Sequence, residues 1–358
     1  MSRLSVLLAA LLLLSQTHFG QRSLSSTLAP SNKSLYKVIY PVVATSTETG
    51  VLPFSAIVVR DIRPDTTKLG FYRSTKDRHS YKYRFTNNTS EELTNFLMAH
   101  YNGNLQKGST QQLVVYLRKM WLSEFDSAEL SLHNTHPKNA WLYLKAEVYL
   151  QSAEALHPVY RIDTVVYARK HNGYTSGGFI TNTLLQGLEE LGRTDFAQVM
   201  RRRKMTQEQV DAFNSRYFLT PDQWKPAKGV YLSFNEFKKG TPSAPDFEVR
   251  FESLTDILYV KEQDGKLYPR KNVWGFCDGE ITFIRMGSNF FPLYNHQQTW
   301  EFYGTASMEF KAPRMPVIAG ASWPLLLASA GVSEVTQYEK RLVNLRAFQV
   351  DVENGKFY

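Results

Sequence analysis

The sequence predicts an α+β fold: a mixed α/β N-terminal half that contains an antiparallel sheet, followed by a β-rich C-terminal half. Up to about residue 225, segments with helical apolar spacing alternate with segments of two-residue period. Beyond residue 229 short strands dominate, separated by Asp-Gly pairs at 264/265 and 278/279 that are typical of hairpin turns. These observations divide the chain into an α+β domain at 35–225 and a β-rich domain at 226–358.

The composition is that of a folded, basic protein. The chain has 358 residues, 43% hydrophobic and 13% aromatic, which is enough for sizeable cores. Its 42 basic and 33 acidic side chains leave a formal charge of +9, which favours an anionic partner such as a lipid or polysaccharide surface. Because both signs are mixed along the chain, the alternative is a moderately basic surface without a specific ligand. No nucleic acid is expected as a partner.

The N-terminus has the layout of a secretory signal peptide. Arg3 supplies a positive charge, residues 6–14 are an unbroken apolar run, and polar and small residues follow up to Gly20. We therefore expect a signal peptide at 1–20, a linker at 21–34 and an exported protein that is periplasmic, envelope-associated or secreted. The alternative is a retained N-terminal anchor, although the run is shorter than the roughly 20 apolar residues that span a bilayer.

Strands and one capped helix are expected in the first part of the N-terminal half. The strands, rich in apolar and β-branched residues, are placed at 35–43, 54–60, 81–85 and 113–121. Thr89 followed by Glu92 predicts a capping box at the start of a helix with its apolar stripe running to Tyr101.

Residues 141–150 give the clearest two-residue period in the chain. Alternate apolar residues form one face, and the other face carries Lys145 and Glu147 between aromatic side chains. This is typical of an antiparallel strand with one solvated or partly covered face, paired with residues 160–167. An exposed row of Trp141, Tyr143 and Tyr149 would make a platform for carbohydrate or peptide. The alternative is that these residues cover a neighbouring helix or domain.

Two later segments of this half suggest anion binding. The glycine-containing loop at 171–178 precedes a helix but lacks the Lys-Ser/Thr ending of a phosphate loop, so an interdomain loop is favoured over a nucleotide site. Arg201, Arg202 and Arg203 form the densest basic cluster, a candidate contact for phosphate or anionic lipid. The alternative is a solvated helix end whose cations complement the helix dipole. Thr206 with Gln209 predicts another capped helix.

The C-terminal half is expected to gather strands around residues 274–293. Cys277, the single cysteine, lies in this segment and is expected to be a small buried hydrophobe without a disulfide. Residues 317–332 are almost uncharged, with Trp323, Leu325 and Leu326 flanking Pro324. Burial against the β-rich half is favoured; the alternative is attachment to an envelope partner or the membrane, since bulky apolar side chains need cover.

No catalytic or metal-binding motif is present. His133 and His136 lie in a turn-forming context without a neighbouring acid, and the sequence contains no nucleophile elbow or zinc-binding helix. We therefore expect no cofactor and no metal, and the chain is more typical of a non-enzyme. Glycosidase carboxylates, however, are scattered in sequence and would leave no motif.

Three segments, at 273–279, 287–293 and 351–355, resemble a pattern of exported Bacteroidota-type proteins of unknown function. The resemblance covers mainly residues 229–358. It implies an envelope or secreted location and supplies no catalytic residue. The sequence thus predicts an exported non-enzymatic binding or scaffold protein of the bacterial cell envelope. The alternative is a secreted hydrolase that acts on glycan or peptide through scattered carboxylates.

Overall fold

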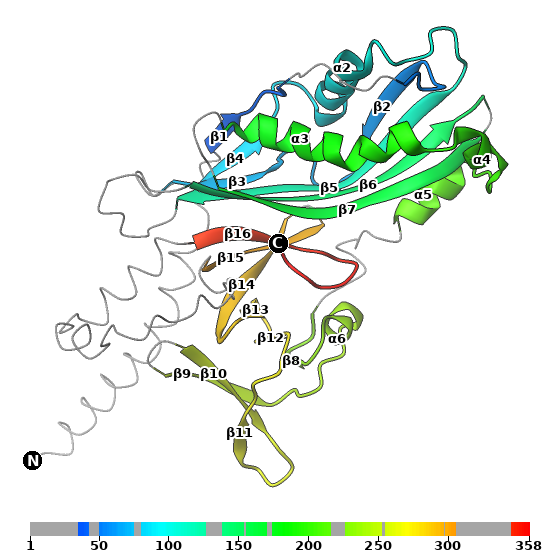
Figure 1. Ribbon diagram of the computed structural model, residues 1–358. Helices are drawn as coiled ribbons and strands as arrows, with labels where there is room; N and C mark the ends of the chain where they lie inside the picture. Colours follow the sequence, from blue (N-terminus) through cyan, green and yellow to red (C-terminus); the bar gives the residue numbers. More distant parts are fainter. Residues whose placement is uncertain are drawn as a thin grey trace, which may run out of the picture. The chain divides into compact units, whose positions relative to one another are not determined.

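The computed structural model describes residues 35–42, 50–74, 80–126, 138–153, 155–169, 174–215, 226–252, 255–296, 298–305 and 345–358 (Figure 1). Its fold is α+β, as predicted, and the described strands form three sheets. Leu35–Tyr358 forms one compact unit. The predicted signal peptide and linker lie outside the described residues, as do His133, His136, Trp323, Leu325 and Leu326. The domain boundary at 225/226 stays a prediction.

The first sheet has seven strands in the order β1-β4-β3-β5-β6-β7, with β2 also paired to β5. The long strands β5, β6 and β7 form an antiparallel meander, which confirms the strand pair predicted from the two-residue period. The strands are β1 (Leu35–Val38), β2 (Ala56–Asp61), β3 (Gly70–Arg73), β4 (Ser80–Arg84), β5 (Gln112–Asp126), β6 (Lys138–Gln151) and β7 (Leu156–Arg169).

Helices cover one face of this sheet. The apolar face predicted for β6 is fully buried and shares one core with α2 (Thr89–Tyr101), α3 (Ser176–Leu188) and α4 (Phe196–Arg201) (Figure 1). A 3-10 turn at Glu189–Arg193 links α3 to α4. The helices lie on the sheet because their leucine and phenylalanine stripes need an apolar surface to cover them.

The start of α2 differs by one residue from the prediction. Asn88, not Thr89, is the N-cap, and its side chain accepts from Glu91 N at 2.8 Å. Glu92 reaches back to accept from Asn87 N at 3.1 Å. Asn is at least as good an N-cap as Thr, so the helix begins at Thr89, one residue earlier than the predicted box implied.

The capping box predicted for α5 (Gln207–Ser215) is present. Thr206 Oγ1 accepts from Gln209 N at 3.3 Å, and Gln209 Oε1 accepts from Thr206 N at 3.1 Å. Each side chain therefore satisfies a backbone donor that the helix leaves open.

Replacement of this cap gives a first expected result. Thr206→Ala should lower the free energy of unfolding by about 1 kcal/mol, because Gln209 N loses the hydroxyl that accepts its hydrogen bond, whereas the backbone N–H of residue 206 is kept. Urea denaturation measures the change. Ser215→Ala, at the exposed end of the same helix, is the control and should stay within about 0.5 kcal/mol of the parent. Equal effects of the two substitutions would show that the box contributes nothing.

The remaining strands form a three-stranded sheet, β11-β10-β9, and a six-stranded sheet, β16-β15-β14-β13-β12-β8. The helix α6 (Phe234–Lys239) follows β8. The strands are β8 (Gly229–Tyr231), β9 (Phe247–Glu252), β10 (Thr255–Lys261), β11 (Leu267–Pro269), β12 (Gly275–Cys277), β13 (Thr282–Met286), β14 (Asn289–His296), β15 (Thr299–Thr305) and β16 (Leu345–Val350).

Both predicted Asp-Gly turns connect antiparallel strands. Gly265, at φ 79°, lies in the β10–β11 connection, and Gly279, at φ 109°, lies between β12 and β13. The second turn is tight, since Asp278 N donates to Ile281 O at 3.1 Å. Glycine is favoured at both places because it adopts positive φ without strain. Cys277 is buried in β12, as expected for a small hydrophobe.

Candidate functional site

The second face of the seven-stranded sheet is covered, so Trp141, Tyr143 and Tyr149 do not form an exposed platform, and the favoured interpretation, that they cover neighbouring elements, is confirmed. Tyr143 is 1% exposed and Tyr149 is 3% exposed. Tyr149 packs with Val210 of α5, and Tyr143 packs with Ala347 of β16. Trp141 is half-buried, with the Arg346 guanidinium 4.7 Å from its ring. These aromatic side chains cover neighbouring elements and present no open platform.

The basic cluster at Arg201, Arg202 and Arg203 is exposed at the C-terminal end of α4. Arg202 donates from Nη1 to the carbonyl oxygen of Val159 at 3.1 Å. Cations at this end of a helix complement its dipole. Binding of phosphate or lipid by the cluster remains a hypothesis.

A bulge in β5 places two adjacent cations on the covered face. Neighbouring residues of a regular strand point to opposite faces, but the register with β6 shifts between Leu117 and Lys119. Arg118 is the extra residue. It binds Glu147 of β6, and Lys119 lies opposite Lys145. The apolar face resumes at Met120, which belongs to the core under the helices.

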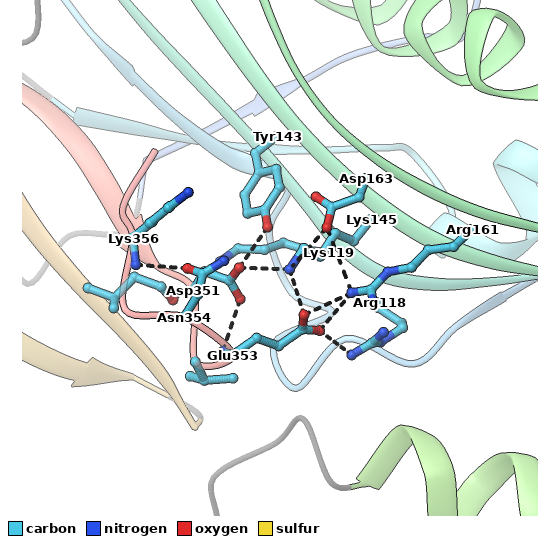
Figure 2. Close-up of polar contacts among 12 residues, drawn as sticks. Arg118, Lys119, Tyr143, Lys145, Arg161, Asp163, Asp351, Glu353, Asn354 and Lys356 are labelled. Carbon is cyan, nitrogen blue, oxygen red and sulfur yellow. Dashed lines mark hydrogen bonds and ion pairs between the residues drawn. The ribbon is translucent and has the colours of Figure 1, made fainter. Parts of the chain in front are cut away.

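The cations meet two carboxylates that follow β16 (Figure 2). Lys145 Nζ lies 2.7 Å from Asp351 Oδ2 and 2.9 Å from Glu353 Oε2. Arg161 Nη2 lies 2.8 Å from Glu353 Oε2, and Arg118 Nη2 binds the other oxygen of that carboxylate. We call Arg118, Lys145, Arg161, Asp351 and Glu353 the ionic clamp.

The C-terminal turn presents these carboxylates to the sheet. Gly355 N donates to Asp351 O at 2.7 Å, and Gly355 has φ 71°, so the chain turns directly after β16. Glu353 N donates to Asp351 Oδ1 at 3.2 Å, which fixes one carboxylate relative to the other. Tyr143 adds a hydroxyl donor to Asp351 Oδ2 at 2.8 Å.

The ionic clamp keeps its members charged. Burial by itself raises the pKa of Asp351, but Lys119, Lys145 and the Tyr143 hydroxyl outweigh it and hold that pKa below its ordinary value. Burial also opposes ionisation of Glu353, whose pKa is nevertheless lowered by Lys145, Arg118 and Arg161. The pKa of Lys145 is raised, because its bonds to the two carboxylates outweigh the effect of burial. Opposite charges at hydrogen-bond distance favour the ionised form of each partner.

Lys119 lies beside the clamp without a carboxylate of its own. Its Nζ donates to Val350 O at 3.2 Å and sits 4.8 Å from the centre of the Tyr143 ring. Among the described residues, no carboxylate oxygen lies within 4.0 Å of this nitrogen. Burial lowers the pKa of Lys119 to about 8; Asp351 opposes this change and Lys145 adds to it.

A small cavity borders the clamp. Its volume is about 50 Å³, and its lining includes Lys68, Lys119, Gln298, Val350 and Asp351. A cavity of this size holds a few water molecules, whereas ligand pockets commonly measure several hundred Å³. The cavity therefore suits hydration of the buried charges better than binding of a sugar or peptide.

The sequence interpretation did not identify the clamp. Lys145 was expected on a solvated or partly covered face, and residues 351–355 entered only as part of a resemblance. The available signal was Arg118-Lys119 inside the otherwise apolar strand 113–121, because a buried charge requires a partner. That partner, Glu353, lies 235 positions further along the chain.

The described residues contain no cluster of three or more His, Cys, Asp or Glu side chains that could hold a metal ion. No helix in the described part of the chain combines the length and hydropathy needed to cross a membrane.

No family model and no curated protein matches the chain. Among solved structures, the chain is similar to a Xanthomonas campestris protein of the DUF330 family, with a TM-score of 0.26 and 12% sequence identity. The match covers 44% of this chain and 90% of that chain. A similarity this low shows neither family nor function, so the resemblance to Bacteroidota-type proteins stays a prediction.

Proposed function

We propose that this chain is an exported, non-enzymatic binding or scaffold protein of the bacterial cell envelope. The observation that carries the proposal is the state of Asp351 and Glu353. Both carboxylates have lowered pKa values and are held by cations, so neither donates a proton near neutral pH. A hydrolase acting on glycan needs one carboxylic acid with a raised pKa that faces its substrate. In this arrangement the carboxylates attach the C-terminal segment to the first sheet.

The export part of the proposal rests on the N-terminal sequence. Arg3 and the apolar run at 6–14 have the order of a signal peptide. An exported protein without disulfides must take its folding stability from its core and its buried ion pairs. Cys277 is the single cysteine of the sequence and is buried, so the chain forms no internal disulfide.

A second candidate function, a secreted hydrolase, is favoured by one observation. Burial raises the pKa of Glu147 in spite of Arg118 and Arg161, whereas the pKa of Glu353 is lowered. Two nearby carboxylates with pKa values pushed apart are the pattern of an acid and its partner. Arg118 and Arg161, however, each bind both carboxylates, so guanidinium groups occupy the position where a substrate bond would lie.

Mass spectrometry of the protein from fractionated cells tests the first proposal. We expect an intact mass that corresponds to a chain starting near residue 21, found in the envelope or secreted fraction. An uncleaved chain in the cytosol would overturn it. Assays with glycan and peptide substrates test the second candidate function, the hydrolase. It would replace the binding proposal if the parent turns over a substrate and Glu147→Gln does not, while the melting temperature of the variant is unchanged.

A further inference from the structure

The edge of the seven-stranded sheet has an unusual composition. Strands β1, β4 and β3 lie side by side at that edge (Figure 1). Their sequences are LYKV, SYKYR and GFYR, with four cations, several tyrosines and not one carboxylate. Every charged side chain within these three strands is therefore basic.

Large apolar side chains line the same edge. Tyr36, Val38, Tyr40 and Val42 are between 36% and 68% exposed, whereas Ile39 is buried. Tyr36 and Val38 occupy alternate positions of β1, so they point to one side. Tyr40 and Val42 follow the strand, and Val42 lies beside Gly178 at the start of α3. Single exposed hydrophobic residues are ordinary, but four in a row form a patch of the kind that marks an interaction surface.

The strand register adds cations to this patch. Lys82 lies opposite Tyr36, and Arg84 lies opposite Val38. The Arg84 guanidinium is 4.6 Å from the centre of the Tyr36 ring. No described carboxylate lies within ion-pair distance of Arg84. We call Tyr36, Val38, Tyr40, Val42, Lys82 and Arg84 the docking face.

The backbone under the docking face is fixed. Ile39 N donates to Arg84 O at 2.9 Å, which continues the attachment of β1 to β4. The next residue lies directly on the start of α3, since a Cβ added at Gly177 would be 1.8 Å from Tyr40 O. The exposed side chains are therefore presented by a held segment, which reduces the entropy lost on binding.

We propose that the docking face binds the surface of an anionic lipid bilayer. Tyrosine rings suit the headgroup layer, valine side chains suit the acyl boundary below it, and Lys82 and Arg84 suit the lipid phosphates. The aliphatic members favour lipid over a hydrated polyanion, because a polysaccharide or nucleic acid gives valine no apolar environment. This inference rests on the proposed envelope function and names its partner.

The position of the face in the chain supports this occupant. It begins at residue 35, directly after the N-terminal segment that contains the apolar run at 6–14. Whether that run is removed during export or retained as an anchor, the docking face is the first described element to follow it. The formal charge of +9 adds a general attraction toward an anionic surface.

Vesicle co-sedimentation tests the proposal. Residues 21–358, which include the whole compact unit Leu35–Tyr358, are mixed with phosphatidylcholine vesicles that contain or lack phosphatidylglycerol. We expect binding to the anionic vesicles only, weakened by salt. Tyr40→Ser/Val42→Ser and Lys82→Gln/Arg84→Gln should each reduce the partition coefficient by about tenfold or more. The matched control, Tyr268→Ser in β11 with Lys271→Gln just after that strand, should bind as the parent does.

The outcomes separate this inference from its alternatives. Absence of binding to anionic vesicles, or equal binding by both docking-face variants and the control, overturns it. Binding to soluble polyanion that depends on Lys82 and Arg84 but not on Tyr40 and Val42 would replace lipid with a hydrated polymer. A large fall in the melting temperature of the docking-face variants would show that the chain itself covers the face. If the chain is exported but does not bind vesicles, only the proposed lipid binding by the docking face is overturned. If the chain is cytosolic and uncleaved, the proposed function is overturned.

Discussion

Lys145→Met is expected to lower the free energy of unfolding by about 3 kcal/mol or more, the largest loss from any single substitution in the ionic clamp. The substitution preserves the length of the side chain but leaves Asp351 buried and ionised without its bonded cation. Removal of one partner from a buried ion pair is costly because the remaining charge is kept from water. Lys119 stays within electrostatic reach of Asp351, which keeps the effect near the lower end of the usual range.

Urea denaturation at neutral pH measures this loss. Arg250→Met is the control, because its ion pair with Glu248 joins two side chains that are about half exposed. Its effect should stay within about 0.5 kcal/mol. The double variant Lys145→Met/Asp351→Asn should recover part of the stability, since position 351 then holds no buried carboxylate that has lost its cation. A loss in Lys145→Met no greater than in Arg250→Met would show that the clamp does not hold the C-terminal segment.

Lys119→Met should have the opposite sign and raise the free energy of unfolding by about 2 kcal/mol at pH 7. Lys119 and Lys145 face each other in the register of β5 and β6, and no carboxylate of the described residues lies within ion-pair distance of Lys119. Its pKa of about 8, against an ordinary 10.5, means that the native state bears a cost for holding the charged form. Methionine fills a similar volume without that charge.

The pH dependence has a defined direction. Below about pH 8 Lys119 is charged in both states, so the full cost of burial is present. Between about pH 8 and 10.5 the unfolded chain binds more protons than the native chain, so this group makes stability rise with pH. The advantage of Lys119→Met should therefore be largest at pH 7 and shrink toward pH 10.

Paired urea titrations of parent and variant at pH 7 and about pH 9.5 measure this change. The buried Tyr143, whose pKa is raised by burial and by Asp351, affects both proteins alike and cancels in the difference. Destabilisation by Lys119→Met at pH 7, or an advantage that is the same at both pH values, would contradict the expected result.

The sequence by itself determined the elements whose signals are local. The two-residue period at 141–150 predicted β6 and its antiparallel partner, because strand alternation repeats within one element. Thr206 with Gln209 predicted the capping box of α5, since both bonds lie within one helical turn. The Asp-Gly pairs at 264/265 and 278/279 predicted hairpin connections, because glycine adopts positive φ without strain wherever it lies in the chain.

Only the tertiary structure decided what covers the second face of the first sheet. Alternation gives β6 two faces, but it does not say that Tyr143 meets β16 or that Tyr149 meets α5. The bulge at Arg118 depends on a register with another strand, and Glu353 comes from the far end of the chain. Similarly, residues 35–43 were predicted to be a strand, whereas the exposure of Tyr36 in β1 follows from the place of that strand at the sheet edge. Period and capping act over a few residues, while burial and ion pairing depend on which distant segments the fold brings together.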